Sequence, residues 1–305
     1  MKPIATLFLA ASALLAQNPV EGPVTGWVWD SNRAAIRPVL GIPGASVLGE
    51  GVDAGVVFSK AVPARGYSIG IAAEGGQAYL VRANSQGKAE LMQGIPAGAS
   101  RIVLSPSGDS AAFLYEDSHK LVVVDGLPSI GSEPREYNLG GVPSAMALAD
   151  GGAFLAASLD NAVVILDRDG NRWNAGQDRA ASALAFLDAS NDLLIGDDSA
   201  LWLLRNVRNP ERSLLAETAV RAVSATGDRA YALAVDGNSK LQLIHLANRT
   251  VRELETPVEP ALLSRLAGNV FRINDSGTEP MWLVDLSTSE PRTVFVPADP
   301  KPAEQ

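Results

Sequence analysis

The acidic residues that could do chemistry recur at regular places, one in almost every predicted hairpin turn. They are Glu74, Asp117, Asp160 beside Asn161, Asp197 beside Asp198, Asp236 beside Asn238, and Asp275. A surface carrying one acid per turn would attract cations or a basic partner. The same residue types are also what tight turns require, because Asp and Asn tolerate positive φ and hydrogen-bond locally. We expect turn formation to be their main role. The candidate binding residues among them are Asp117, Asp160, Asp197 and Asp236.

A second polar set stands just before the predicted first strand of successive repeats. Its members, spaced 43, 38 and 39 residues apart, are Arg101, Ser144, Ser182 and Arg221. Two arginines at equivalent positions of a ring could bind an anionic group over a central channel. Pairing with a turn acid of a neighbouring repeat is the more common use of such residues, and both uses stay open here. This set completes the candidate binding residues.

Catalytic and metal-binding patterns are weak. The two histidines, His119 and His245, stand outside any His-x-x-x-His or Glu-x-x-His setting, and no Gly-x-Ser-x-Gly elbow occurs. Residues 167–171 lack the spacing and distant Glu of a calcium loop. The chain has no cysteine, which excludes thiolate metal sites. We therefore predict no catalytic residue, no metal ligand and no cofactor, and favour a non-enzymatic role over an enzymatic one.

The elements that would position these residues are strands in a long repeat. Residues 105–125 form a turn, a strand, a polar turn at 117–119 and a second strand that ends on an acid. The same strand ending recurs at intervals of 52, 43, 42, 38, 40 and 40 residues, at Asp30, Arg82, Asp125, Asp167, Arg205, His245 and Asp285. A period near 40 with several short strands predicts an all-β protein, a β-propeller of four-stranded blades.

Six full blades can be placed at residues 55–92, 101–139, 144–173, 182–215, 221–254 and 261–296. An N-terminal pair at 27–30 and 35–40 adds two strands, and 47–59 could supply another. We favour seven blades with an irregular first one; the alternative is six blades with an N-terminal hairpin outside the ring. The connector at 41–46 resembles those at 94–100 and 140–144, which predicts blade junctions at all three.

The predicted domain plan is a signal peptide at 1–16, a lead-in at 17–26, the propeller at 27–297 and a disordered tail at 298–305. Lys2 and the apolar run 4–15 before Ala16 are typical of a secretory signal. Its removal would leave no transmembrane segment, and the absence of cysteine excludes lipoprotein attachment. We expect a periplasmic or secreted protein.

The composition limits the class of partner that the protein is expected to bind. The formal charge is −9 and no Lys/Arg-rich run occurs, so an electrostatic footprint for nucleic acid is missing. We expect a protein or a small molecule as partner, and no nucleic acid.

Residues 105–108 (Ser-Pro-Ser-Gly), 113–115 (Phe-Leu-Tyr), 117–118 (Asp-Ser) and 122–125 (Val-Val-Val-Asp) resemble the repeat of bacterial YVTN-type and WD-repeat propellers. The resemblance implies fold, not activity. The leading hypothesis is an exported, non-enzymatic recognition scaffold. The alternative is a propeller enzyme, lactonase-like or a metal-dependent hydrolase, in which acids and Asn from several blades meet in the channel.

Overall fold

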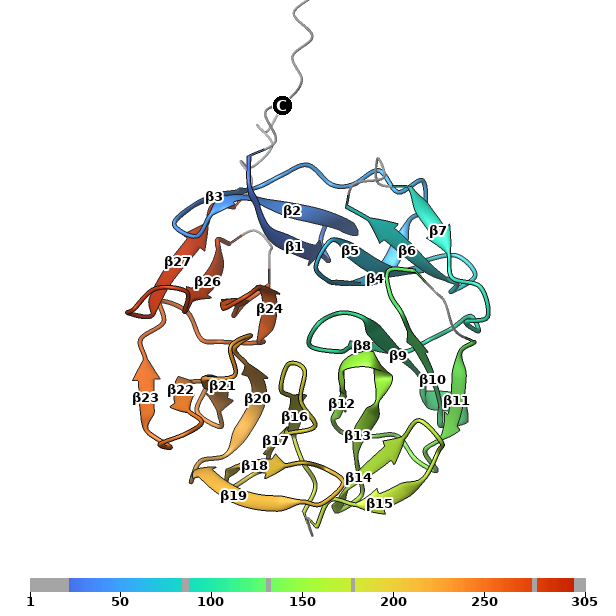
Figure 1. The fold of residues 1–305 in the computed structure, drawn as a ribbon. Helices are drawn as coiled ribbons and strands as arrows, with labels where there is room; N and C mark the ends of the chain where they lie inside the picture. The colour runs from blue at the N-terminus through green and yellow to red at the C-terminus, as the bar shows by residue number, and fades with distance from the viewer. Residues whose placement is uncertain (1–21, 84–87, 130–132, 177–178, 276–278, 299–305) are drawn as a thin grey trace, which may run out of the picture.

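The computed structural model describes residues 22–83, 88–129, 133–176, 179–275 and 279–298. They form seven antiparallel sheets arranged as blades around a central axis, a seven-bladed β-propeller (Figure 1). The prediction of an all-β propeller with seven blades is confirmed. Within the described ranges the only helices are two 3-10 turns, η1 (Glu116–Ser118) and η2 (Asp150–Gly152). None of the helices in that part of the chain could cross a membrane.

Blades are numbered here in chain order. Blade 1 is β1 (Val24–Asp30), β2 (Ala35–Ile42) and β3 (Ala45–Leu48). Blade 2 is β4 (Phe58–Pro63), β5 (Tyr67–Ala72), β6 (Ala78–Arg82) and β7 (Ala89–Leu91). Blade 3 is β8 (Arg101–Leu104), β9 (Ser110–Tyr115), β10 (Lys120–Asp125) and β11 (Arg135–Asn138). Blade 4 is β12 (Met146–Leu148), β13 (Phe154–Leu159), β14 (Ala162–Asp167) and β15 (Arg172–Asn174).

Blade 5 is β16 (Ala183–Phe186), β17 (Leu193–Gly196), β18 (Leu201–Arg205) and β19 (Glu211–Ala216). Blade 6 is β20 (Val220–Ala225), β21 (Tyr231–Asp236), β22 (Leu241–His245) and β23 (Val251–Leu254). Blade 7 is β24 (Ser264–Ala267), β25 (Val270–Arg272), β26 (Met281–Asp285) and β27 (Arg292–Val296). In blades 2 to 7 the first strand lies nearest the axis and the fourth lies on the rim.

The core lies between blades. On β9, Ala111 and Phe113 pack with blade 2, whereas Ala112 and Leu114 pack with blade 4. Both faces of the middle strands are therefore buried, and for this reason the sequences of these strands are nearly unbroken apolar runs. Equivalent clusters join every other adjacent pair of blades, including blade 7 with blade 1 and blade 1 with blade 2.

Blade 1 is the irregular one, as predicted, and its three strands occupy the second to fourth positions. Gly26 lies against Leu266 of β24, so close that a Cβ on Gly26 would stand 2.9 Å from the Leu266 Cβ. Arg272, which pairs with Ser264, donates to the Trp29 carbonyl at 3.4 Å. These contacts place β1 antiparallel to β24, whereas the innermost strands of neighbouring blades run parallel. Within the described residues the innermost position of blade 1 is empty.

Two sequence alignments are corrected by this arrangement. Asp30 ends a second strand, whereas the other six residues of its series end third strands, and this explains the long first interval of 52. The connector at 41–46 is the turn between β2 and β3, and not a blade junction. The first strand begins at Val24, inside the predicted lead-in, and the predicted signal peptide lies outside the described residues.

The disc has two faces that carry different turns. We call the face with the turns between second and third strands, together with the blade-to-blade connections, the junction face. We call the opposite face, which carries the turns between first and second strands, the cavity face.

Candidate ligand-binding site

A central cavity of about 590 Å³ opens among the innermost strands of blades 2 to 7. Aliphatic and polar groups share its wall, and several of the aliphatic lining residues, Val62, Val103 and Leu104 among them, are only partly buried. Most of its polar lining comes from turns of the cavity face. The charged residues that line it are Arg65, Asp188 and Arg265.

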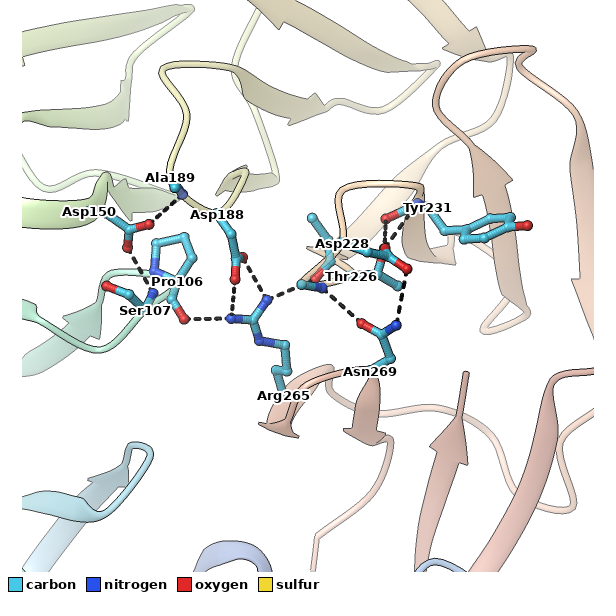
Figure 2. Close-up of polar contacts among 12 residues, drawn as sticks. Pro106, Ser107, Asp150, Asp188, Ala189, Thr226, Asp228, Tyr231, Arg265 and Asn269 are labelled. Atoms are coloured by element: carbon cyan, nitrogen blue, oxygen red, sulfur yellow. Dashed lines mark hydrogen bonds and ion pairs between the residues drawn. The ribbon is translucent and has the colours of Figure 1, made fainter. Parts of the chain in front are cut away.

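Arg265 bridges the cavity mouth from blade 7 to blades 5 and 3 (Figure 2). Its two terminal nitrogens donate to both carboxylate oxygens of Asp188, at 2.6 and 2.7 Å. One of them also donates to the Pro106 carbonyl at 2.6 Å. The guanidinium and the carboxylate are each about a fifth exposed, at 20% and 22%. Bidentate geometry with little solvent makes this a strong pair, and it neutralises two of the three cavity charges.

Further turn residues link neighbouring blades on the same face. Asp150 of blade 4 accepts from the Ser107 amide at 2.8 Å and from the Ala189 amide at 2.6 Å, in blades 3 and 5 (Figure 2). Asn269 of blade 7 accepts from the Gly227 amide at 2.9 Å and donates to Asp228 at 3.3 Å. These contacts hold the turns of five consecutive blades, 3 to 7, in one polar network.

Asp109 belongs to this network. It accepts from the Gly151 amide of blade 4 at 2.8 Å and from Ser105 and Ser110 of its own turn, both at 2.9 Å. Burial by itself would raise the pKa of Asp109, but these hydrogen bonds outweigh it and leave the pKa below its ordinary value. The pKa of Asp228 is lowered by the same balance of burial and hydrogen bonds. Both groups are therefore held as carboxylates.

Arg65 is the third charged residue of the cavity lining. It stands exposed in the turn between β4 and β5 at the cavity rim, and within the described part of the chain it forms no ion pair. Since Asp188 and Arg265 cancel, the described lining carries one net positive charge in a protein of formal charge −9. A chamber with aliphatic side chains in its wall, and with a guanidinium at its mouth that forms no ion pair with the described residues, is suited to an amphipathic anion.

The predicted first-strand set lies on the junction face, and three of its four members form hydrogen bonds across blade boundaries. Ser144 Oγ donates to the Ala181 carbonyl at 3.0 Å, and Ser182 Oγ donates to the Val220 carbonyl. Arg101 donates to the Pro143 carbonyl at 3.3 Å and to Glu116 at 3.3 Å, whereas Arg221 donates to Ser239 at 2.5 Å. Each of the four is engaged by other protein groups.

The structure aligns these first-strand positions differently from the sequence pattern, which set Arg101 equivalent to Ser144 and Ser182. Ser100, Ser144 and Ser182 each have amide and hydroxyl directed at one carbonyl of the adjacent second strand. Arg101 therefore follows that position by one residue.

The four predicted turn acids divide into two pairs. Asp117 and Asp160 are exposed, and Asp160 has a φ of 51°, as a tight turn requires. Asp197 and Asp236 are buried, at 1% and 4% exposure. Asp197 accepts from the Ser199 amide and hydroxyl, the Ala200 amide and the Trp202 indole. For the buried pair, turn formation accounts for the carboxylate oxygens.

The hydrogen bonds that Asp197 accepts also affect its pKa. Burial alone would raise its pKa, yet the hydrogen bonds from Ser199, Ala200 and Trp202 bring the pKa below its ordinary value.

Groups for metal or acid-base chemistry are sparse in the described residues. These residues hold no cluster of three or more His, Asp or Glu that could bind a metal ion. The cavity lining, as far as it is described, contains one acid, Asp188, and Arg265 occupies both of its oxygens. The convergence of acids that a metal-dependent channel enzyme requires is not formed by this part of the chain.

Sequence reasoning missed Arg65, Asp188 and Arg265. A signal was present: Asp109, Asp150, Asp188 and Asp228 recur at intervals of 41, 38 and 40 residues in the turns after first strands. That series predicts a second acid-bearing face. The partner Arg265 lies 77 residues after Asp188 and belongs to no such series.

No protein-family model matches the chain, and curated protein sequences give no match. Among solved structures, 1446 chains match, as expected of a fold that serves many functions. Hsv2 of Kluyvelomyces marxianus is similar with a TM-score of 0.57 and 10% identity, over 87% of this chain and 92% of that one. The β-propeller domain of Cps50 (Swd1) of Myceliophteria thermophila has a TM-score of 0.56 and 12% identity, over 91% and 88%.

An enzyme is also among the similar structures. The dihydro-heme d1 dehydrogenase NirN, in complex with DHE, has a TM-score of 0.54 and 16% identity over 76% of this chain. This chain spans about half of NirN, 54% of its length. At these identities the likenesses show the fold alone: a seven-bladed propeller with WD-repeat-like neighbours and no particular family.

Proposed function

We propose that the protein is an exported, non-enzymatic recognition scaffold that binds a small amphipathic anion in its central cavity. The carrying observation is the cavity itself, whose described lining offers aliphatic side chains and one guanidinium, Arg65, that forms no ion pair with the described residues. The apolar body of the ligand would displace water from side chains such as Val62 and Val103, and its anionic group would reach Arg65.

Rigidity supports this proposal. The network of blades 3 to 7 fixes the cavity mouth before any ligand arrives, so little ordering is needed on binding. Arg265 contributes to that rigidity and is not the anion site, because Asp188 and Pro106 already accept its hydrogen bonds.

The junction face is the second candidate surface. Six of the predicted binding residues are accessible to solvent on this face: Asp117, Asp160, Arg101, Ser144, Ser182 and Arg221. The exposed turn acids of this face would favour a cationic partner. The two surfaces are therefore separable by the sign of the ligand charge.

The test uses decanoate, decanol and decylamine as probes of equal chain length, with binding followed by isothermal titration calorimetry. We expect the wild-type protein to prefer decanoate, and Arg65→Gln to weaken decanoate binding roughly 5- to 10-fold while decanol binding changes little. Arg221→Gln, on the junction face, is the matched control and should leave all three affinities unchanged.

Two results would contradict the proposal. Equal affinity of decanoate and decylamine would remove the role of Arg65, and a loss of binding in Arg221→Gln alone would transfer the site to the junction face. Export is tested separately by mass spectrometry of the native protein, which should lack about the first 16 residues; an intact Met1 in a cytoplasmic fraction would refute it.

A further inference from the structure

Two exposed arginines on the rim of blade 5 lie over aromatic rings. The Cζ atom of Arg212 is 3.7 Å from the centre of the Trp202 ring, and that of Arg208 is 5.0 Å from the centre of the Phe154 ring. Arg208 belongs to the turn between β18 and β19, and Arg212 to the outermost strand β19. Both arginines are exposed, so a ligand can reach them from solvent.

The two rings place both guanidiniums along the boundary between blades 4 and 5. Phe154 and Trp202 pack against the hydrophobic cluster that these two blades share. Phe154 begins β13 at the cavity face, whereas Trp202 lies three residues before Arg205, which ends β18 at that face. At about 3.3 Å per residue, the rings are therefore at least about 10 Å apart along the strands. We call this boundary, with Arg208 and Arg212 on its rim, the arginine seam.

The donors of both guanidiniums are unused by the described residues. Neither the Arg208 nor the Arg212 side chain forms an ion pair or a hydrogen bond with them. A contact with a ring uses the face of a guanidinium and leaves the N–H donors, which lie in its plane, available. The ring also restricts the long side chain, so less conformational entropy is lost on binding. Each guanidinium is thus prepared to donate two parallel hydrogen bonds to a carboxylate.

The acids nearby do not neutralise the seam. Glu211 stands opposite Arg205, a third exposed arginine, in the register of β18 and β19. The pKa of Asp167 is lowered mainly by its hydrogen bond with Asn171 and also by the charge of Arg208. Both Asp167 oxygens accept hydrogen bonds from Asn171, and Asp167 forms no ion pair with Arg208 in the described part of the chain. The seam therefore keeps a positive charge in a protein of formal charge −9.

We propose that the arginine seam binds an extended acidic segment of another protein, with two carboxylates four residues apart. Residues four apart in an extended chain lie on one side and about 13 Å from each other. Flexible Glu side chains can adjust this spacing to that of the two guanidiniums. One carboxylate would accept from Arg208 and the other from Arg212, each through two hydrogen bonds. Arg and Trp are also the residues that most often dominate the binding energy of protein interfaces.

A protein carboxylate fits the seam better than a nucleic acid. The two guanidiniums offer only two anion positions, and the net negative charge of the molecule opposes the approach of a long polyanion. Two charge-assisted contacts over a small area give weak binding, with a Kd on the order of 100 μM to 1 mM. This site is separate from the central cavity.

The probe is a rhodamine-labelled peptide, Ser-Glu-Ser-Val-Ser-Glu-Ser, whose binding is followed by fluorescence anisotropy at low salt. Arg208→Gln and Arg212→Gln should each weaken binding roughly 5- to 10-fold, and so should replacement of both peptide Glu residues by Gln. Arg252→Gln is the matched control and should change the affinity less than about 2-fold. Arg252 is exposed on the outermost strand β23 and has neither a ring contact nor an ion pair among the described residues.

A double variant, Arg208→Lys/Arg212→Lys, separates geometry from charge. It keeps both charges but loses the planar fork, so it should still bind several-fold more weakly than the wild type. Full affinity in this double variant would overturn the bidentate geometry.

Three further results would overturn the proposal. They are equal binding of the Glu and Gln peptides, an equal loss in Arg252→Gln, and tighter binding of a single-stranded oligonucleotide than of the Glu peptide. If the arginines only cover the rings, the Gln variants would lose thermal stability and keep their peptide affinity, which would also refute it. Decanoate binding should be unchanged in Arg208→Gln, so the cavity proposal is tested independently.

Discussion

The acids of the two faces of the disc do different work. On the cavity face, Asp150 and Asp188 bond to residues of other blades, and so they join parts of the ring far apart in sequence. On the junction face, Asp197 and Asp236 bond to the turns that contain them. The same residue type is therefore an inter-blade clamp in one place and a local turn former in the other. Only the three-dimensional arrangement separates these uses.

The largest expected loss of stability comes from the junction face. Asp197→Ala would leave the Ser199 and Ala200 amides and the Trp202 indole without the buried carboxylate that accepts their hydrogen bonds. We expect the free energy of unfolding to fall by about 3 kcal/mol, measured by urea denaturation. Loss of less than about 1 kcal/mol would show that water replaces these bonds and that the turn is not built on Asp197.

The clamp of the cavity face should come next. Asp188→Ala leaves a mostly buried guanidinium with carbonyl partners only, which should cost about 2 kcal/mol. The double variant Asp188→Ala/Arg265→Ala should be less destabilised than the sum of the single variants, since no unpaired charge remains. Strict additivity of the two single effects in the same urea experiment would mean that the pair does not couple blades 5 and 7.

Acidic pH should destabilise the folded protein through carboxylates on both faces. The pKa values of Asp109, Asp197 and Asp285 are lowered in the folded protein, where hydrogen bonds outweigh burial. Their stabilisation is complete above the unfolded value of about 3.9 and is lost as pH falls through the lower folded values. The thermal midpoint should be flat from about pH 7 to 5 and should fall below about pH 4.

Asp109→Asn provides the control for this pH dependence. The substitution removes one of the titrating groups, so the thermal midpoint of the variant should fall less in acid than that of the wild type, by a few degrees (roughly 2–4 °C per kcal/mol). An unchanged profile would show that Asp109 does not titrate with a lowered pKa.

The smallest effect is expected at the exposed turn acids. Asn tolerates the positive φ of Asp160, and Asp117 is exposed in the 3-10 turn η1, so Asp117→Asn and Asp160→Asn should each change the unfolding free energy by less than about 0.5 kcal/mol. Neither should alter decanoate binding. A large loss of binding in either variant would locate recognition on the junction face.

Strands and turns were predictable because their signals are local. Ala111 to Leu114 on β9 are buried on both faces, and such apolar runs between Asp- and Gly-rich turns mark strands wherever they occur. The seven-blade count followed from their period.

The cavity network was not predictable in the same way. Arg265 meets Asp188 across 77 residues and Pro106 across 159, contacts that depend on how the ring closes. The reversed placement of β1 likewise rests on the close packing of Gly26 against Leu266, which no repeat period records.

Hydrogen–deuterium exchange with and without saturating decanoate tests the central claim most directly, because it reports where the ligand lies. The account predicts slower exchange in the cavity-lining segments 62–66, 103–108 and 263–268, and no change in the junction-face turns at 116–119 and 160–162. Protection confined to the junction-face turns, or spread evenly over both faces, would contradict recognition in the central cavity.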